Sequence, residues 1–125
     1  MKIYMVRHGE TNWNKEVRMQ GISDVRLNEE GKYQATVTSG ILNKINFDIC
    51  YSSPLIRAYE TANIILSGKD TKIIIDDLLI ERNMGDYEGG APYNSVEYWD
   101  YKKNLSDHNV ESVRAILQRS DKFVE

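Results

Sequence analysis

The sequence has few of the residues that build cross-links, and it has no long apolar segments. Cys50 is the only cysteine, which excludes an internal disulfide and a cysteine metal site. A single cysteine fits a reducing compartment, so we expect a cytoplasmic protein. The longest apolar runs, such as Ile73–Ile75 and Leu78–Ile80, are far too short to span a membrane. Lys2 is followed by no long apolar region, which is unlike a signal peptide.

Neither sign of charge dominates the composition. The chain has 16 Lys+Arg and 19 Asp+Glu, so its formal net charge is -3. This balance argues against nucleic acid and against an anionic membrane as partners, although a small arginine cluster can still bind an anionic ligand. No repeat or linker divides the 125 residues, and we therefore expect residues 1–125 to form one domain.

Three short apolar runs are predicted to be strands: Lys2–Val6, Phe47–Tyr51 and Lys72–Ile75. Each run is nearly continuous rather than alternating, which is typical of strands covered on both faces in a parallel sheet. Helices are predicted between them, from Asn28 to Lys44 and from Ser53 to Gly68. The second of these helices begins with a serine N-cap and a proline in its first turn.

A glycine-rich loop, Glu81–Tyr93, follows the last predicted strand. Helices are predicted after it over Ser95–Tyr101 and Val110–Val124. The order β-α-β-α-β-loop-α-α predicts an α/β fold with a parallel sheet. The chain stops at the end of a helix, and in such folds a helix normally leads into another strand. We therefore expect a C-terminal part to be missing.

Polar side chains follow each predicted strand. Arg7 and His8 come directly after the first, Arg57 lies in the helix after the second, and Glu81 lies a few residues beyond the third. Ligands in open α/β sheets bind at the carboxyl ends of strands, so these segments are expected to converge on one crevice. Taken singly, each residue is more often an ordinary surface residue. It is their order along the chain that favours a site.

The chemistry of this set suits a phosphate group. Arginine forks match phosphate oxygens, and the helix start at Ser53-Pro54 offers free N–H groups. A ring nitrogen of His8 could attack phosphorus, while Glu81 could protonate the leaving oxygen. Gly9 would let the backbone approach the ligand closely. The pattern predicts a phosphoryl-transfer site.

Five blocks of the sequence carry a resemblance to a known family. They are RHGETNWN (7–14), MQGISDVRLNEEGKYQA (19–35), SSPLIRAYETA (52–62), ERNMGDYEG (81–89) and ESVRAI (111–116). In this order they resemble the histidine phosphatase superfamily, the phosphoglycerate mutase-like proteins. The resemblance implies a three-layer α/β/α phosphoglycerate mutase-like fold with a parallel sheet, lacking the C-terminal strands.

The resemblance also implies roles for individual residues. His8 would be the phosphohistidine nucleophile, Arg7 and Arg57 would hold the phosphate, and Glu81 would be the proton donor. The phosphate or substrate pocket would be lined by Asn14, Gln20 and Gly21. The family needs no metal and no cofactor. The implied partner is a small phosphorylated substrate or inorganic phosphate.

The sequence departs from the family in two places. Arg26 stands where a proline is usual, which is a small change in a turn. The family also carries a second catalytic histidine, in a His-Gly pair after a central strand, whereas this chain has only His8 and His108. We read His108, in the polar stretch SDHN, as a surface histidine. The chain is then a fragment with impaired activity, or its strands pair differently, or a second copy completes the sheet as a homodimer.

Phosphomonoester hydrolysis is the function favoured by the sequence. A phosphoglycerate mutase needs extra basic residues after the catalytic glutamate, and no Lys or Arg lies between Met84 and Asp100. The alternatives are cofactor-dependent mutase activity and a non-catalytic fragment that only binds phosphate.

Overall fold

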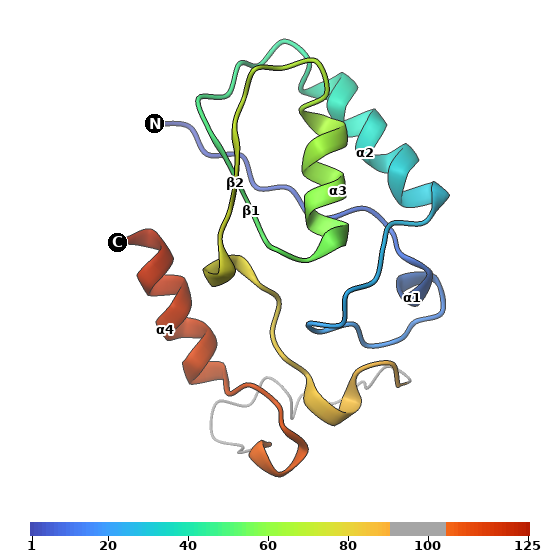
Figure 1. The fold of residues 1–125 in the computed structure, drawn as a ribbon, viewed down its shortest axis with the longest axis vertical. Coiled ribbons are helices and arrows are strands. Elements are labelled where there is room, and N and C mark those ends of the chain that lie inside the picture. The colour runs from blue at the N-terminus through green and yellow to red at the C-terminus, as the bar shows by residue number, and fades with distance from the viewer. Residues whose placement is uncertain (91–104) are drawn as a thin grey trace.

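The computed structural model describes residues 1–90 and 105–125 as an α/β arrangement. Figure 1 shows α2 and α3 side by side, with β1 and β2 beside α3 and with α4 at the other end of the molecule. In chain order the elements are α1 (Asn12–Lys15), α2 (Glu29–Ile41), β1 (Cys50–Ser52), α3 (Ile56–Ile65), β2 (Ile73–Ile75) and α4 (Val113–Val124). The short 3-10 turns are η1 (Asp77–Leu79), η2 (Gly85–Tyr87) and η4 (Ser106–His108).

Two of the predicted strands pair as expected. β1 and β2 run parallel, with Cys50 opposite Ile73 and Ser52 opposite Ile75. Parallel neighbours need a crossover between them, and α3 supplies it. The predicted parallel sheet is therefore confirmed for these two runs, although each strand is shorter than its apolar run.

The prediction for Lys2–Val6 is wrong, because this segment forms no strand. Ile3 is 72% exposed and Met5 is 92% exposed. A strand needs a neighbour that shares its backbone hydrogen bonds, and no strand in the described parts of the chain pairs with residues 2–6. The rings of Tyr4 and Phe47 pack edge-on, with their centroids 5.4 Å apart. This aromatic contact is present where a ladder of backbone hydrogen bonds was predicted.

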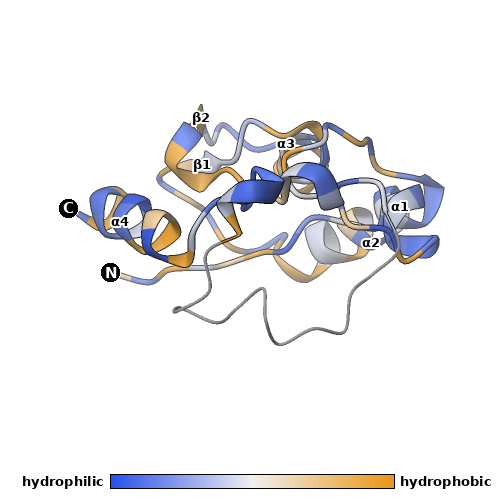
Figure 2. Cartoon of the chain, turned by 90° about the horizontal axis from the view of Figure 1, so that it is seen from below, coloured by the Kyte–Doolittle hydropathy of each residue, from blue (hydrophilic) through white to orange (hydrophobic). Residues whose placement is uncertain are grey.

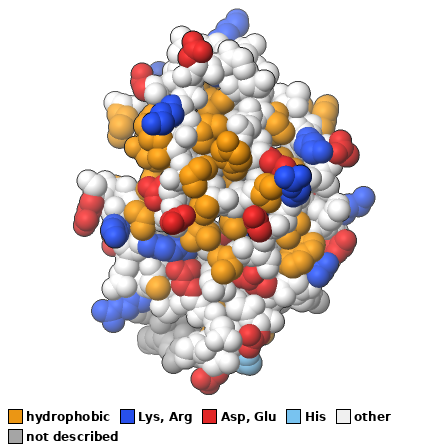
Figure 3. Space-filling view, viewed as in Figure 1, with side chains coloured by type: hydrophobic (Ala, Val, Ile, Leu, Met, Phe, Trp, Pro, Cys, Tyr) orange, Lys and Arg blue, Asp and Glu red, His pale blue; other side chains and the backbone are white. Residues whose placement is uncertain are grey.

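The two strands are also less covered than their apolar sequences predict. Tyr51 and Ile75 are both almost half exposed, and Figure 3 shows many hydrophobic side chains open on this side of the molecule. α3 packs against both strands, while α4 reaches β1 through an edge-on contact between Phe123 and Tyr51. The described helices therefore cover the sheet only in part.

The first predicted helix is confirmed with a different end. Asn28 caps α2 by accepting a hydrogen bond from the Gly31 N–H, and two glutamates occupy the first turn. The helix ends at Ile41 rather than at Lys44. Ala35, only 2% exposed, lies on the face that packs against α3.

The second helix begins later than predicted. α3 starts at Ile56, and Leu55 is its N-cap without a side-chain hydrogen bond. Ser53 Oγ accepts only from the Leu55 N–H, at 3.3 Å. The carboxylate of Asp24, from a distant loop, accepts from the Ile56 N–H at 2.7 Å. Two of the N–H groups expected to be free at this helix start, those of Leu55 and Ile56, are thus bound by side-chain oxygens of the protein.

The C-terminal helix is confirmed from Val113 onward, with Ser112 as its N-cap. Figure 2 shows both hydrophilic and hydrophobic residues on α4. Val110 lies outside the helix and is buried against Met84 in a small apolar cluster. The predicted helix Ser95–Tyr101 lies outside the described residues.

One short helix was missed by the sequence reasoning. α1 begins with a capping box in which Thr11 and Asn14 exchange hydrogen bonds. Among residues 1–90 and 105–125, no helix has the length and hydrophobicity needed to cross a membrane.

Two glycines let the segment after His8 pack closely on α2. A Cβ on Gly9 would overlap the carbonyl group of Gly31, and a Cβ on Gly31 would overlap the backbone of Glu10. On the other side, the Gly9 N–H donates to Thr61 Oγ1 of α3 at 3.0 Å. The close approach that the structure shows at Gly9 is therefore to protein backbone.

This packing predicts opposite effects for two glycines of the same helix. Gly31→Ala should destabilise the fold by about 1–3 kcal/mol, because the added methyl group meets backbone that cannot swing away. Gly40→Ala is the matched control: nothing lies within 4 Å of its Cβ position, and a helical alanine should stabilise by roughly 0.5–1 kcal/mol. Urea unfolding of both variants tests this, and equal shifts of the two midpoints would contradict it.

Candidate active site

A cleft of about 260 Å³ opens where the N-terminal segment meets α1 and α2. Its lining residues are Arg7, His8, Gly9, Glu10, Asn14 and Gln34. Three of the predicted site residues, Arg7, His8 and Asn14, thus share one cleft. Glu10 and Gln34 were not predicted, and they are joined by a hydrogen bond from the Glu10 N–H to Gln34 Oε1 at 3.0 Å.

The imidazole of His8 is held through one nitrogen. Nδ1 lies 2.7 Å from the carbonyl oxygen of Gly9. A carbonyl oxygen can only accept, so Nδ1 carries the hydrogen and Nε2 keeps its lone pair when the ring is neutral. This is the tautomer that a nucleophile acting through Nε2 requires.

The surroundings of His8 favour the neutral ring. Partial burial lowers its pKa below 6.5; the Gly9 carbonyl opposes this shift, the charges of Arg57 and Arg7 add to it, and Glu81 opposes it weakly. Charges act at this strength only over short distances. Arg57 and Glu81 therefore lie within electrostatic range of the His8 ring, but neither of them lines the cleft.

The two predicted phosphate arginines have different environments. Arg7 is exposed, and no hydrogen bond or ion pair joins its guanidinium to a described residue. Arg57 is only 2% exposed; its Nη1 donates to the Ser23 carbonyl at 2.8 Å and its Nη2 donates to the Gly21 carbonyl at 2.7 Å. Burial lowers the pKa of Arg57, against the pull of nearby carboxylates. Arg57 thus holds the loop at Gly21 and Ser23 through hydrogen bonds and also contributes a buried positive charge.

That loop carries two more predicted residues, neither of which lines the cleft. Gln20 is buried and its Oε1 accepts from the Thr11 hydroxyl. Gly21 has a φ of 53°, a left-handed conformation that favours glycine, and its carbonyl accepts from Arg57. Thr11 also donates its N–H to Asn14 Oδ1 at 3.0 Å. Thr11 thus links the loop to α1.

Glu88 holds the same loop from the other side and was missed by sequence reasoning. Its carboxylate accepts from the N–H groups of Ile22 and Ser23, both at 2.9 Å, and from the Ser23 hydroxyl. It also accepts from the Met84 N–H at 3.0 Å. The only signal in the sequence was a carboxylate inside the glycine-rich block, without any indication of its partners.

Glu81 and His108 occupy different environments. Glu81 is exposed, and its Oε1 accepts from the N–H of Arg82 at 2.8 Å. His108 is half exposed, with Nδ1 3.8 Å from Asp86 Oδ2, which agrees with its prediction as a surface histidine. Within the described ranges, no three His, Cys, Asp or Glu side chains are grouped to hold a metal ion.

The lowered pKa of His8 predicts a pH dependence of stability. Below pH 6.5 the unfolded chain takes up a proton at this ring more readily than the native chain does, so native stability falls as the pH decreases through this range. His8→Ala should remove this contribution and flatten the curve between about pH 5 and 6.5. Urea unfolding at several pH values measures both slopes. Parallel curves for wild type and variant would rule the effect out.

The contacts of Glu88 predict a second effect. Glu88→Gln puts an N–H₂ group where backbone N–H groups need acceptors, and should destabilise by about 1–3 kcal/mol. Glu16→Gln is the control, since Glu16 forms an exposed ion pair with Arg18 and should change stability by less than about 0.5 kcal/mol. Thermal unfolding compares the two, and an unchanged Glu88→Gln protein would show that the carboxylate is dispensable.

The chain is similar to several known phosphatases and mutases. Phosphoserine phosphatase 1 of Hydrogenobacter thermophilus is 34% identical over 133 residues, which cover 100% of this chain and 63% of that protein. A 2,3-bisphosphoglycerate-dependent phosphoglycerate mutase of Cytophaga hutchinsonii is 39% identical over 113 residues, covering 84% and 53%. The crystal structure of an alpha-ribazole phosphatase from Shigella flexneri matches with a TM-score of 0.83 and 27% identity, over 95% of this chain and 63% of the other.

The chain thus spans about half to two thirds of the length of these relatives. The structural match shows a phosphoglycerate mutase-like fold with a small parallel sheet. Residues 3–125 match the family described as the histidine phosphatase superfamily (branch 1). The resemblance seen in the sequence blocks is therefore confirmed, and the chain belongs to the histidine phosphatase superfamily, branch 1.

Proposed function

We propose that this chain carries the phosphoryl-accepting site of a phosphatase that hydrolyses a small phosphorylated metabolite through a phosphohistidine. The observation that carries the proposal is the hydrogen bond from His8 Nδ1 to the Gly9 carbonyl, which leaves Nε2 as the nucleophilic nitrogen. The exposed guanidinium of Arg7 lies in the same cleft. An imidazole and a guanidinium therefore share the cleft, which supports the proposal.

The proposed reaction has two steps. His8 Nε2 attacks the phosphorus of a phosphomonoester, an N–P bond forms, and the P–O bond to the alcohol breaks. Glu81 gives a proton to the departing oxygen, which leaves as the alcohol. Water then attacks phosphorus and passes a proton to the Glu81 carboxylate. The N–P bond breaks, and inorganic phosphate leaves with His8 restored.

The remaining predicted residues have supporting roles in this proposal. Arg7 binds the phosphate oxygens directly, since its forked donors are free to do so. Arg57 adds positive charge from a buried position, where a cation near a dianion is screened little by water. Asn14 lines the cleft, while Gln20 and Gly21 shape its neighbouring loop.

Hydrolysis is favoured over isomerisation by the distribution of charge. A mutase must hold the second charged group of a phosphoglycerate, and the sequence from Met84 to Asp100 contains no Lys or Arg. Mutase activity is the second candidate, because a phosphoglycerate mutase is 39% identical over 84% of this chain. The two activities differ in product: free phosphate or a transferred phosphate.

The relatives are longer than this chain. We propose that residues 1–125 form the larger part of one three-layer α/β/α domain, whose remaining strands correspond to the further length of the relatives. With His8 and a surface His108 as the only histidines, this chain by itself should accept a phosphoryl group but complete the cycle slowly. A metal-independent reaction in the cytoplasm stays our expectation.

A labelling experiment tests the proposal. Incubation with a ³²P-labelled phosphomonoester should give an acid-labile, base-stable label on the wild-type chain, because a phosphohistidine forms. His8→Ala should give no label, and His108→Ala is the matched control that should keep it. Transfer of label to phosphoglycerate would favour the mutase, while absence of label on the wild type would leave only phosphate binding.

A further inference from the structure

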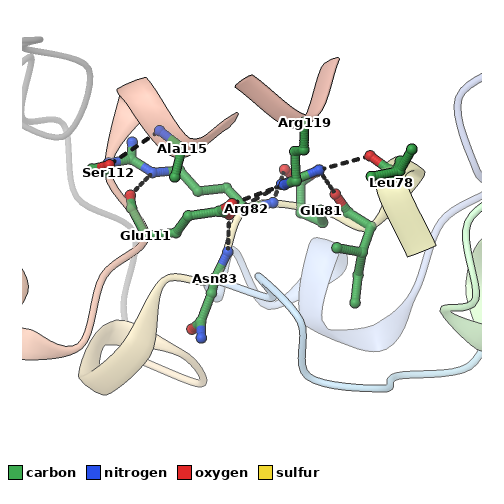
Figure 4. Close-up of polar contacts among 9 residues, drawn as sticks. Leu78, Glu81, Arg82, Asn83, Glu111, Ser112, Ala115 and Arg119 are labelled. Atoms are coloured by element: carbon green, nitrogen blue, oxygen red, sulfur yellow. Dashed lines mark hydrogen bonds and ion pairs between the residues drawn. The ribbon is translucent and has the colours of Figure 1, made fainter. Parts of the chain in front are cut away.

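The segment that carries Glu81 has no regular structure of its own. Residues 80–84 belong to neither a helix nor a strand. A proton donor must nevertheless be held within a fraction of an ångström to work, so something outside the segment has to fix it. Figure 4 shows two side chains that surround this segment, Arg119 from α4 and Glu111 from the stretch before it.

Arg119 holds the backbone that precedes Glu81. Its Nη1 donates to two carbonyl oxygens, that of Leu78 at 3.0 Å and that of Ile80 at 2.6 Å. Leu78 lies in η1, and α4 packs against this turn. One guanidinium nitrogen thus fixes the path of the chain on the upstream side of the carboxylate.

Glu111 holds the backbone that follows Glu81. Its N–H donates to the Asn83 carbonyl at 2.8 Å, and its Oε2 accepts from the Asn83 N–H at 3.1 Å. Its own carbonyl accepts from Nε of Arg82 at 2.8 Å. Residues on both sides of Glu81 are therefore attached to the C-terminal part of the chain.

The two holding residues are joined by a two-pronged ion pair. Arg119 Nε donates to Glu111 Oε1 at 2.8 Å, and Arg119 Nη2 donates to Glu111 Oε2 at 3.0 Å. Both side chains are more than four-fifths buried, so their attraction is screened less than that of an exposed pair. Burial raises the pKa of Glu111, but the hydrogen bonds from Arg119 and Asn83, together with the charges of Arg119 and Arg82, lower it overall.

We propose that Arg119 and Glu111 are positioning residues, which act through the backbone on either side of Glu81 to place its carboxyl group as the proton donor. The inference rests on the proposed function, because Glu81 acts as a proton donor only in that reaction. It also gives a role to Glu111, the first residue of the block ESVRAI. Arg119 does not contact the phosphate or the reacting atoms in this scheme.

A comparison of leaving groups separates positioning from general stability. Arg119→Met should slow phosphoenzyme formation from glycerol 3-phosphate by about 100-fold, because its alkoxide must be protonated as it leaves. With 4-nitrophenyl phosphate the loss should stay below about threefold, since nitrophenolate leaves without help. Arg114→Met, which removes an exposed arginine of the same helix, should change neither rate. Arg119→Lys keeps the charge without the fork and should be intermediate.

Hydrogen exchange gives a readout that needs no catalysis. In Arg119→Met the amide of Asn83, which donates to Glu111, should exchange at least about tenfold faster, while the amide of Gly9 should be unchanged. Arg114→Met should leave both amides unchanged. An unaltered Asn83 amide in Arg119→Met would overturn the proposal whatever the kinetics show.

The outcomes distinguish this inference from the proposed function. If the wild type forms no phosphoenzyme, the proposed function fails and the catalytic role of the pair fails with it, while exchange still reports the mechanical link. If the wild type is active and Arg119→Met loses rate equally with both esters, the pair is merely structural and the positioning role is overturned. Selective loss with the alkyl ester, together with faster Asn83 exchange, supports it.

Discussion

The arrangement depends on one close contact between two backbone segments. Gly9 and Gly31 meet without side chains between them, and the Gly9 N–H is held by Thr61 on the opposite side. The carbonyl of the same Gly9 then fixes the ring of His8. α2 and α3 therefore determine where the imidazole lies, because both act on the residue next to it. Residues 2–6, which lead into the site, are exposed and contribute little to this placement.

Charged side chains bonded to backbone organise the rest of the site. Arg57 binds carbonyl groups of the loop around Gly21, Glu88 binds N–H groups of the same loop, and Arg119 binds carbonyl groups beside Glu81. Irregular segments leave such groups without partners, and leaving them buried and unpaired is costly. In this protein the loops that carry the proposed chemistry are thus shaped by a few ionic side chains. The apolar cluster beside them is small, being centred on Met84 and Val110.

The sequence predicted features that depend on local pattern. The apolar runs that became β1 and β2 and the N-cap of α2 are local, and Arg7, His8 and Asn14 of the first motif lie in one cleft. The prediction of a strand at Lys2–Val6 was wrong because an apolar composition does not specify which strand will pair with it. The predicted start of α3 was wrong because its first N–H is capped by Asp24, a residue that is distant in sequence. The roles of Glu88 and Arg119 were not predicted for the same reason. A side chain that binds backbone distant in the sequence produces no periodic pattern in the sequence.

The Asp24 carboxylate caps the first turn of α3 and so affects which anions can bind at this helix start. An open helix start attracts sulfate, chloride and phosphate alike, because its dipole and amide groups have little preference among them. Here that end already holds a negative group. Discrimination among anions then falls to guanidinium forks and an imidazole, whose fixed directions suit a tetrahedral oxyanion better than a spherical halide. The Asp24 carboxylate would therefore keep abundant cellular anions from binding at this helix start.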